Sequence, residues 1–206
     1  TELAGPGLVL AQSTFARPEY PPLPHVVGEA QAILAAQHGG LKSGGLKLLQ
    51  PTPSAWEAVL QEEGERPFSR YGWLHIATHA SADPETGAFS GLLLGTEVVH
   101  LEEIQGWRLK AGLVTLSACQ TGMGRWYYGD EVAGLLESFL GAGARAVVVS
   151  LWLVNDEETA EFMRTFYTHL GAGMRPLAAL TEAQRGAFRA GLEPYYWATF
   201  SFFGQP

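Results

Sequence analysis

Three largely apolar runs of seven residues, each followed by a polar or glycine-rich segment, limit most strongly what this chain can fold into. They span residues 73–79, 113–119 and 146–152. Runs this short and this rich in leucine, isoleucine and valine are typical of strands that are buried on both faces. Segments of helical composition, such as 130–140 and 156–170, lie among them. This alternation predicts an α/β fold, with a mostly parallel central sheet and helices on both of its faces.

Shorter elements are expected around these runs. The sequence predicts strands at 7–11 and 46–49, a helix at 26–36, a helix that begins at Thr52-Pro53-Ser54, a hairpin of 91–94 with 98–101, a short amphipathic piece at 101–107, a helix at 177–188 and a closing aromatic strand at 195–203. A hydroxyl cap followed by proline is a favourable helix start.

Two reactive side chains end two of the apolar runs. His79 ends the first run, and Cys119, the only cysteine of the chain, ends the second. If these strands are neighbours in one parallel sheet, the imidazole and the thiol lie at the same edge, where ligand sites of such sheets form. A thiol beside an imidazole is a nucleophile with its base. The alternative for Cys119 is a small buried hydrophobic residue.

Length and charge narrow the classes of protein further. With 206 residues and 47% hydrophobic content, we expect one domain over residues 1–206, and we interpret the start at Thr1 as the start of a piece of a longer protein. Thirteen basic and twenty-one acidic residues give a net charge of −8. This charge repels nucleic acid phosphates and anionic membranes, so a basic polypeptide is the favoured partner.

The remaining motifs predict neither a cofactor nor a metal. A single cysteine excludes an internal disulfide, and the sequence has no signal peptide and no apolar run of 18 residues, so a cytoplasmic location is expected. Gly141-Ala142-Gly143 precedes a strand, which is the wrong polarity for a dinucleotide loop. His75 has the same side-chain parity as His79 but lies deeper in the strand, so it is expected to be a core residue. A metal pair of His75 and His79 is excluded, because four residues along a strand span ~13 Å.

Seven segments, in the same order as in a known family, carry a resemblance over about residues 70–204. They are Leu74–His79, Leu116–Gly122, Gly129–Leu135, Val149–Trp152, Asp156 with Thr159, Phe166-Tyr167 and Pro194–Phe200. In these segments the chain resembles the CHAT domain, a separase-like member of the caspase-type cysteine peptidases of clan CD that is often attached to tetratricopeptide repeats.

The resemblance implies a caspase-like three-layer sandwich with a dyad of His79 and Cys119 that cleaves a protein substrate. It also implies a regulatory domain or partner, such as tetratricopeptide repeats. Where the clan often has glycine after the histidine, this chain has Ala80, whose backbone N–H remains available. We expect the N–H groups of Ala80 and Cys119 to form the oxyanion hole.

Three residues are candidates for the substrate pocket. Ser117 has the side-chain parity of Cys119, Trp152 ends the next strand, and Asp156 follows it. A substrate could pair its backbone with residues 150–153. The negative domain and Asp156 favour a basic residue before the scissile bond, although a helix cap is an equal alternative for Asp156.

Three functions remain open from the sequence. The first is a regulated cysteine endopeptidase, in which a partner orders the loops 80–90 and 120–129. The second is a catalytically silent interaction domain with a caspase-like fold. The third is another thiol hydrolase on the same scaffold.

Overall fold

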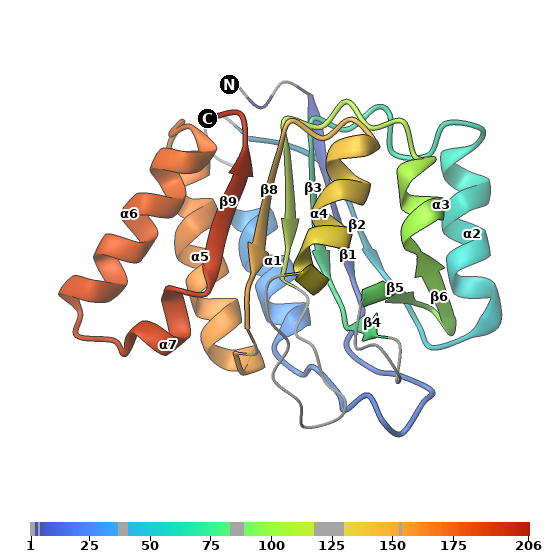
Figure 1. Ribbon diagram of the computed structural model, residues 1–206, viewed down its shortest axis with the longest axis horizontal. Helices are drawn as coiled ribbons and strands as arrows, with labels where there is room; N and C mark the ends of the chain where they lie inside the picture. Colours follow the sequence, from blue (N-terminus) through green and yellow to red (C-terminus); the bar gives the residue numbers. More distant parts are fainter. Residues whose placement is uncertain (1–2, 4, 37–40, 83–88, 118–129, 153) are drawn as a thin grey trace.

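The computed structural model describes residues 3, 5–36, 41–82, 89–117, 130–152 and 154–206, whose elements alternate along the chain (Figure 1). The strands are β1 (Pro6–Ala11), β2 (Lys42–Leu48), β3 (Trp73–Ala77), β4 (Ala80–Ala82), β5 (Phe89–Leu94), β6 (Glu97–His100), β7 (Leu113–Leu116), β8 (Ala146–Ser150) and β9 (Phe200–Gly204). The helices are α1 (Val26–Ala35), α2 (Pro53–Glu63), α3 (Leu101–Gln105), α4 (Asp130–Gly141), α5 (Asp156–Gly171), α6 (Pro176–Arg189) and α7 (Pro194–Trp197).

Six strands form the central sheet in the order β2-β1-β3-β7-β8-β9. Every neighbouring pair is parallel except β8 with β9. The strands β3 and β7 are direct neighbours, and His75 lies opposite Thr115 in their register. The carboxyl ends of β3, β7 and β8 therefore meet at one edge, which is the lower edge in Figure 1.

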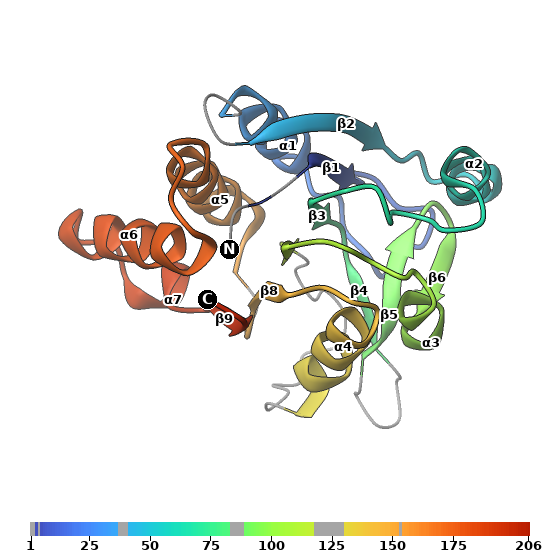
Figure 2. The ribbon, with the colours of Figure 1, turned by 90° about the horizontal axis from the view of Figure 1, so that it is seen from above.

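Helices cover both faces of this sheet, as Figure 2 shows from above. Alternate residues of β3 divide the core: Leu74 and Ile76 pack with α2, α3 and α4, whereas Trp73 and Ala77 pack with α1, α5 and α6. Two apolar layers on either side of one sheet are the packing expected of a three-layer α/β sandwich. The predicted fold class is confirmed.

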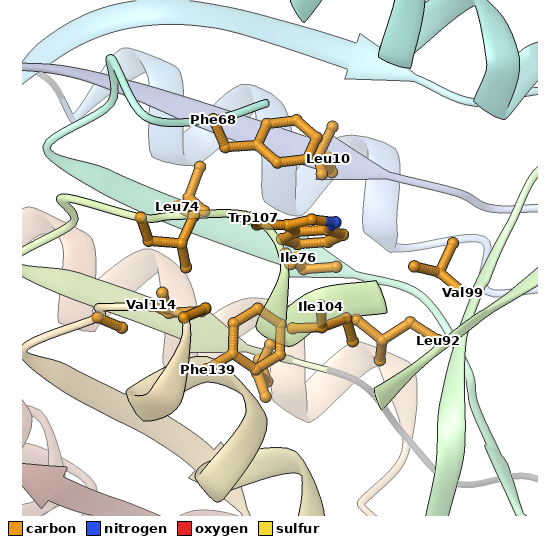
Figure 3. Packing of buried hydrophobic residues seen from close by; sticks show 14 of the residues in the cluster. Leu10, Phe68, Leu74, Ile76, Leu92, Val99, Ile104, Trp107, Val114 and Phe139 are labelled. Atoms are coloured by element: carbon orange, nitrogen blue, oxygen red, sulfur yellow. The ribbon is translucent and has the colours of Figure 1, made fainter. Parts of the chain in front are cut away.

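Aromatic rings fill the layer between the sheet and α4. Figure 3 shows Phe68, Trp107 and Phe139 packed over Leu74 and Ile76. The ring centroids of Phe68 and Trp107 are 4.7 Å apart, and those of Trp107 and Phe139 are 5.9 Å apart. Such edge-on contacts favour particular ring orientations, in addition to the burial of apolar area.

A second, antiparallel sheet of order β4-β5-β6 begins directly after His79. Its β5 and β6 confirm the predicted hairpin. The strand β4 was expected to be part of a loop, because Ala80-Ser81-Ala82 has no strand composition. Its pairing with β5, Ala80 opposite Leu92, overrides that weak local preference.

Some predicted bounds are wrong. The closing strand was expected from residue 195, but α7 occupies Pro194–Trp197 and only β9 is extended. Proline in the first turn favours this short helix. The strands β3 and β8 end two residues earlier than predicted.

Glycine is required at position 7, where β1 passes under an indole ring. A Cβ atom at Gly7 would lie 1.7 Å from Trp73 Cε2. We expect Gly7→Ala to lower the free energy of unfolding, measured by urea titration, by about 1–3 kcal/mol, because the buried ring must move. The control is Gly28→Ala in α1, where an added Cβ meets nothing within 4 Å. It should stabilise the domain by about 0.5–1 kcal/mol, and equal effects of the two changes would contradict this account.

Candidate functional site

His79 lies at the carboxyl edge of the sheet, two residues beyond the end of β3. The neighbouring strand β7 runs toward Cys119, but Cys119 lies outside the described residues, so the distance between the two predicted dyad members stays untested. The described chain reaches Ser117, whose backbone N–H donates to Ile76 O over 3.1 Å. Hydrogen bonding thus joins the end of β7 to β3 up to this point.

The His79 ring is held by a segment from the amino-terminal third of the chain. Its Nε2 lies 2.8 Å from the carbonyl oxygen of Pro21. The rings of Phe15 and Tyr20 pack against it with centroid distances of 4.4 and 5.5 Å. The Tyr20 hydroxyl lies 3.3 Å from Ser81 Oγ, which fixes this segment to β4. His79 has no exposed surface in this arrangement.

The contact with Pro21 assigns the hydrogen on the imidazole. A carbonyl oxygen only accepts hydrogen bonds, so His79 Nε2 carries a hydrogen and donates it. In a neutral ring, the other nitrogen, Nδ1, then has the lone pair. The arrangement therefore orients the ring and selects Nδ1 as its basic atom, which is the task that a carboxylate performs in a catalytic triad.

The residue after the histidine, Ala80, is buried in β4 and lies opposite Leu92. In addition, Leu93 N–H donates to His79 O over 2.9 Å. The backbone that carries the predicted oxyanion donor is thus held by β5. The use of the Ala80 N–H as that donor stays a prediction.

Ser117 is buried, and its side chain contacts another buried polar side chain of the central sheet. Its Oγ lies 3.2 Å from Nε2 of His75, which is also fully buried, as expected for a core histidine. This contact favours a structural role for Ser117 over its predicted place in a substrate pocket, which stays untested.

Trp152 is fixed by the chain that precedes β9. Its indole N–H donates to Tyr195 O over 2.9 Å, and the two rings lie 6.4 Å apart. Thr199 Oγ1 accepts from the backbone N–H groups of both Leu151 and Trp152, at 3.0 Å each. These N–H groups therefore already have acceptors, which weighs against the predicted backbone pairing of a substrate with this segment.

Asp156 joins the starts of two helices. It is the first residue of α5, and its carboxylate accepts from the backbone N–H of His25, which precedes α1. The N-cap of α5 is Asn155, whose side chain accepts from Glu158 N–H, so the cap alternative for Asp156 belongs to Asn155. Burial raises the pKa of Asp156 and the charge of Glu29 adds to this, while the bond from His25 and the charge of His79 act in the opposite direction.

Sequence reasoning missed Pro21, Phe15, Tyr20 and Thr199. The proline-rich composition of residues 18–24 is typical of a turn, but it gives no sign that this segment covers His79. Only the packing of β1 beside β3 brings this segment to the sheet edge.

Neither a metal-binding cluster nor a membrane-spanning helix is present among the described residues. They contain no group of three or more histidine, cysteine or acidic side chains that could hold a metal ion. None of the described helices has the length and apolarity needed to cross a membrane.

Comparisons with known proteins agree with this architecture. The family model described as "CHAT domain" matches residues 2–205. Tetratricopeptide repeat protein 28 of Mus musculus is 36% identical over 99 residues, which are 47% of this chain, and the protein of the same name from Homo sapiens is 34% identical over 115 residues, or 55%. Each match covers 4% of the relative's own length.

Among solved structures, the Saccharomyces cerevisiae separase–securin complex matches with a TM-score of 0.56 and 16% sequence identity. The match covers all of this chain and 12% of the solved chain. At this identity the likeness shows the fold alone.

The raised pKa of Asp156 makes a prediction about stability. A carboxyl whose pKa is higher in the folded state, here above its ordinary value of 3.8, binds more protons folded than unfolded. Its titration therefore lowers stability as pH rises through that range. Asp156→Asn keeps an oxygen acceptor for His25 N–H but does not titrate. We expect its unfolding free energy, relative to the unmodified protein, to increase between pH 4 and pH 7 in urea titrations.

The matched control is Glu157→Gln, which removes the same charge from an exposed position in the same helical turn. Its difference from the unmodified protein should change less over this pH range. A constant difference for Asp156→Asn would contradict the burial of that carboxyl.

Proposed function

This chain belongs to the CHAT domain family, and we propose that it is a regulated cysteine endopeptidase in which His79 activates the thiol of Cys119. One observation carries the proposal: the contact of His79 Nε2 with Pro21 O, which orients the ring and leaves the lone pair on Nδ1. A histidine in a core role does not need one nitrogen selected in this way at the ligand edge of a sheet. Cys119 follows Ser117 by two residues in the sequence, and the Ser117 N–H is bonded to Ile76 O of β3, which supports the pairing of the thiol with that nitrogen.

The proposed reaction uses His79 twice. Its Nδ1 accepts the proton of the Cys119 thiol, and the thiolate attacks the peptide carbonyl. Backbone N–H groups of Ala80 and Cys119 stabilise the developing negative oxygen. His79 then gives the proton to the leaving amine, which departs as the carbon–nitrogen bond breaks. Water, deprotonated by the same nitrogen, hydrolyses the thioester and restores the thiol.

Regulation is part of the proposal because His79 has no exposed surface. A peptide can reach the base only when its cover, to which Phe15 and Tyr20 contribute, moves aside. A partner that moves this cover would switch the activity on. The relatives named for tetratricopeptide repeats support a repeat segment, in the same longer protein or in a partner, as that regulator. A reducing cytoplasm, which keeps the thiol available, belongs to the same proposal.

Specificity is proposed to come from Trp152 and Asp156. The Trp152 ring is held at the end of β8 by Tyr195. The Asp156 carboxylate accepts one backbone hydrogen bond, and no ion pair involving it is present among the described residues. A partly buried carboxylate with no ion pair among the described residues is stabilised by a nearby cationic side chain. We therefore propose a basic residue before the scissile bond.

Thiol labelling tests the dyad without knowledge of the substrate. We expect iodoacetamide to alkylate Cys119 at pH 7 at least about tenfold faster in the unmodified protein than in His79→Ala, because the base raises the thiolate fraction above the few per cent of an ordinary thiol. The control is His169→Ala, which removes a histidine near the end of α5, away from the sheet edge. Cleavage of a partner protein by the unmodified chain but not by Cys119→Ala completes the test.

Two outcomes separate the candidate functions. Equal alkylation rates with and without His79 would remove the dyad and leave the catalytically silent interaction domain. Fast, His79-dependent alkylation without cleavage of any peptide bond, but with hydrolysis of small thioester or amide substrates, would instead indicate another thiol hydrolase.

Peptide-library profiling tests the acidic pocket. We expect the unmodified chain to prefer Arg or Lys before the scissile bond and Asp156→Ala to lower that preference by about tenfold, the effect of losing one partly desolvated charge pair. Glu157→Gln should leave the profile unchanged, because its carboxyl is exposed. An unchanged preference in Asp156→Ala would exclude this carboxylate from the pocket.

A further inference from the structure

A buried polar cluster lies directly beneath the candidate site and has no part in the chemistry proposed above. Its centre is His75 of β3, which contacts Glu29 of α1, Ser117 after β7 and Tyr167 of α5. The four residues are between 0 and 3% exposed. They come from two of the helices that cover this face, α1 and α5, from β3 and from the residue that follows β7.

The distances assign the hydrogens of this cluster. Tyr167 OH donates to Thr115 Oγ1 over 3.0 Å, and burial raises the pKa of Tyr167, so the phenol keeps its hydrogen. With that hydrogen directed at Thr115, the phenol oxygen accepts from His75 Nδ1, 3.2 Å away. His75 Nε2 lies 2.8 Å from Glu29 Oε1. Two bare acceptors would repel at that distance, so one of these two atoms carries a proton.

The His75–Glu29 pair is therefore neutral as a whole, either as imidazolium with carboxylate or as imidazole with carboxylic acid. A neutral pair can be buried where a lone carboxylate cannot. Neither Oε1 nor Oε2 of Glu29 has a partner with hydrogen-bond geometry in the described part of the chain, although Oε1 lies 2.8 Å from His75 Nε2. Such a buried pair contributes little net stability compared with apolar packing, so its benefit to the protein lies elsewhere.

Two routes lead from this pair to the site. In the first, Ser117 Oγ contacts His75, which fixes the end of β7 against β3 two residues before Cys119. In the second, Glu29 fixes the first turn of α1, where Glu29 N–H donates to His25 O over 2.8 Å. The segment that leads into α1 supplies Pro21 O, the acceptor for His79 Nε2. His75 thus contacts Ser117, which precedes Cys119 by two residues, and Glu29 in the helix that follows Pro21.

We propose that Glu29, His75, Ser117 and Tyr167 form a positioning unit for the dyad, which sets the placement of His79 relative to Cys119. This inference rests on the proposed function, because it requires a dyad to position. None of the four residues needs to touch substrate. Their loss should lower the reactivity of the thiol while the domain stays folded, since a displacement of about 1 Å is enough to lower catalytic rates strongly.

The test is the rate of Cys119 alkylation by iodoacetamide as a function of pH, in Ser117→Ala and Tyr167→Phe. The first variant removes the contact between Ser117 and His75, and the second removes the acceptor of His75 Nδ1 that α5 supplies. We expect both to lower the rate at pH 6 by about tenfold and to move the midpoint of the profile toward ~8.5, the value of an ordinary thiol. A purely structural role would change the melting temperature but not this midpoint.

Matched controls make the same chemical changes elsewhere. Ser138→Ala removes a buried hydroxyl from α4, and Tyr71→Phe removes one that contacts Arg70 and Glu63. Both should keep the original midpoint. If Tyr167→Phe fails to fold, Ser117→Ala, which removes a single oxygen, decides alone.

The outcomes separate this inference from the proposed function. If the unmodified chain is no more reactive than His79→Ala, the dyad itself is absent and the inference is overturned with it. If the dyad is present but Ser117→Ala alkylates with the unmodified profile, the positioning unit is wrong and the proposed function stands.

Discussion

The parallel pairing of β3 with β7 is the contact on which the rest of this structure depends. It places His75 opposite Thr115. Because the two strands are parallel, the segments that follow them leave the sheet at the same edge. Because side chains alternate along a strand, this register also decides which residues meet each helical layer. A shift by one residue would expose Leu74 and Ile76 to the polar cluster and bury His75 among the aromatic rings around Trp107. Core packing and site geometry are therefore fixed by the same register.

The contact between His79 and Pro21 orients the imidazole without a charged partner. The carbonyl of Pro21 accepts one hydrogen bond and carries no charge, so it orients the ring without stabilising an imidazolium as strongly as a carboxylate would. A thiol needs less assistance than a serine hydroxyl, because its own pKa lies near the working range. An uncharged orienting group is thus chemically adequate for a cysteine nucleophile.

The sequence predicted the α/β class and the strands β3 and β7, because short and strongly apolar runs leave few alternatives to a buried sheet. That these two strands are neighbours was a condition of the site, and the structure supplies it. Sequence reasoning failed where tertiary contacts override local composition: β4 is extended only through its pairing with β5, and Thr199 ends β8 early by accepting the N–H groups of Leu151 and Trp152. For the site, it selected His79 from its place at a strand end. The support from Pro21 and Phe15 could not be predicted, since no local pattern tells which segment folds over an edge.

The Asp156 carboxyl at this edge has an electrostatic penalty that a nearby positive charge would relieve. Asp156 has a raised pKa because burial and the nearby charge of Glu29 both oppose its ionisation. A Lys or Arg side chain placed beside it would remove both penalties at once, since it would replace lost hydration and offset the repulsion. The electrostatic penalty at this edge therefore lies at Asp156, where α5 begins, and the net charge of −8 of the domain does not relieve it.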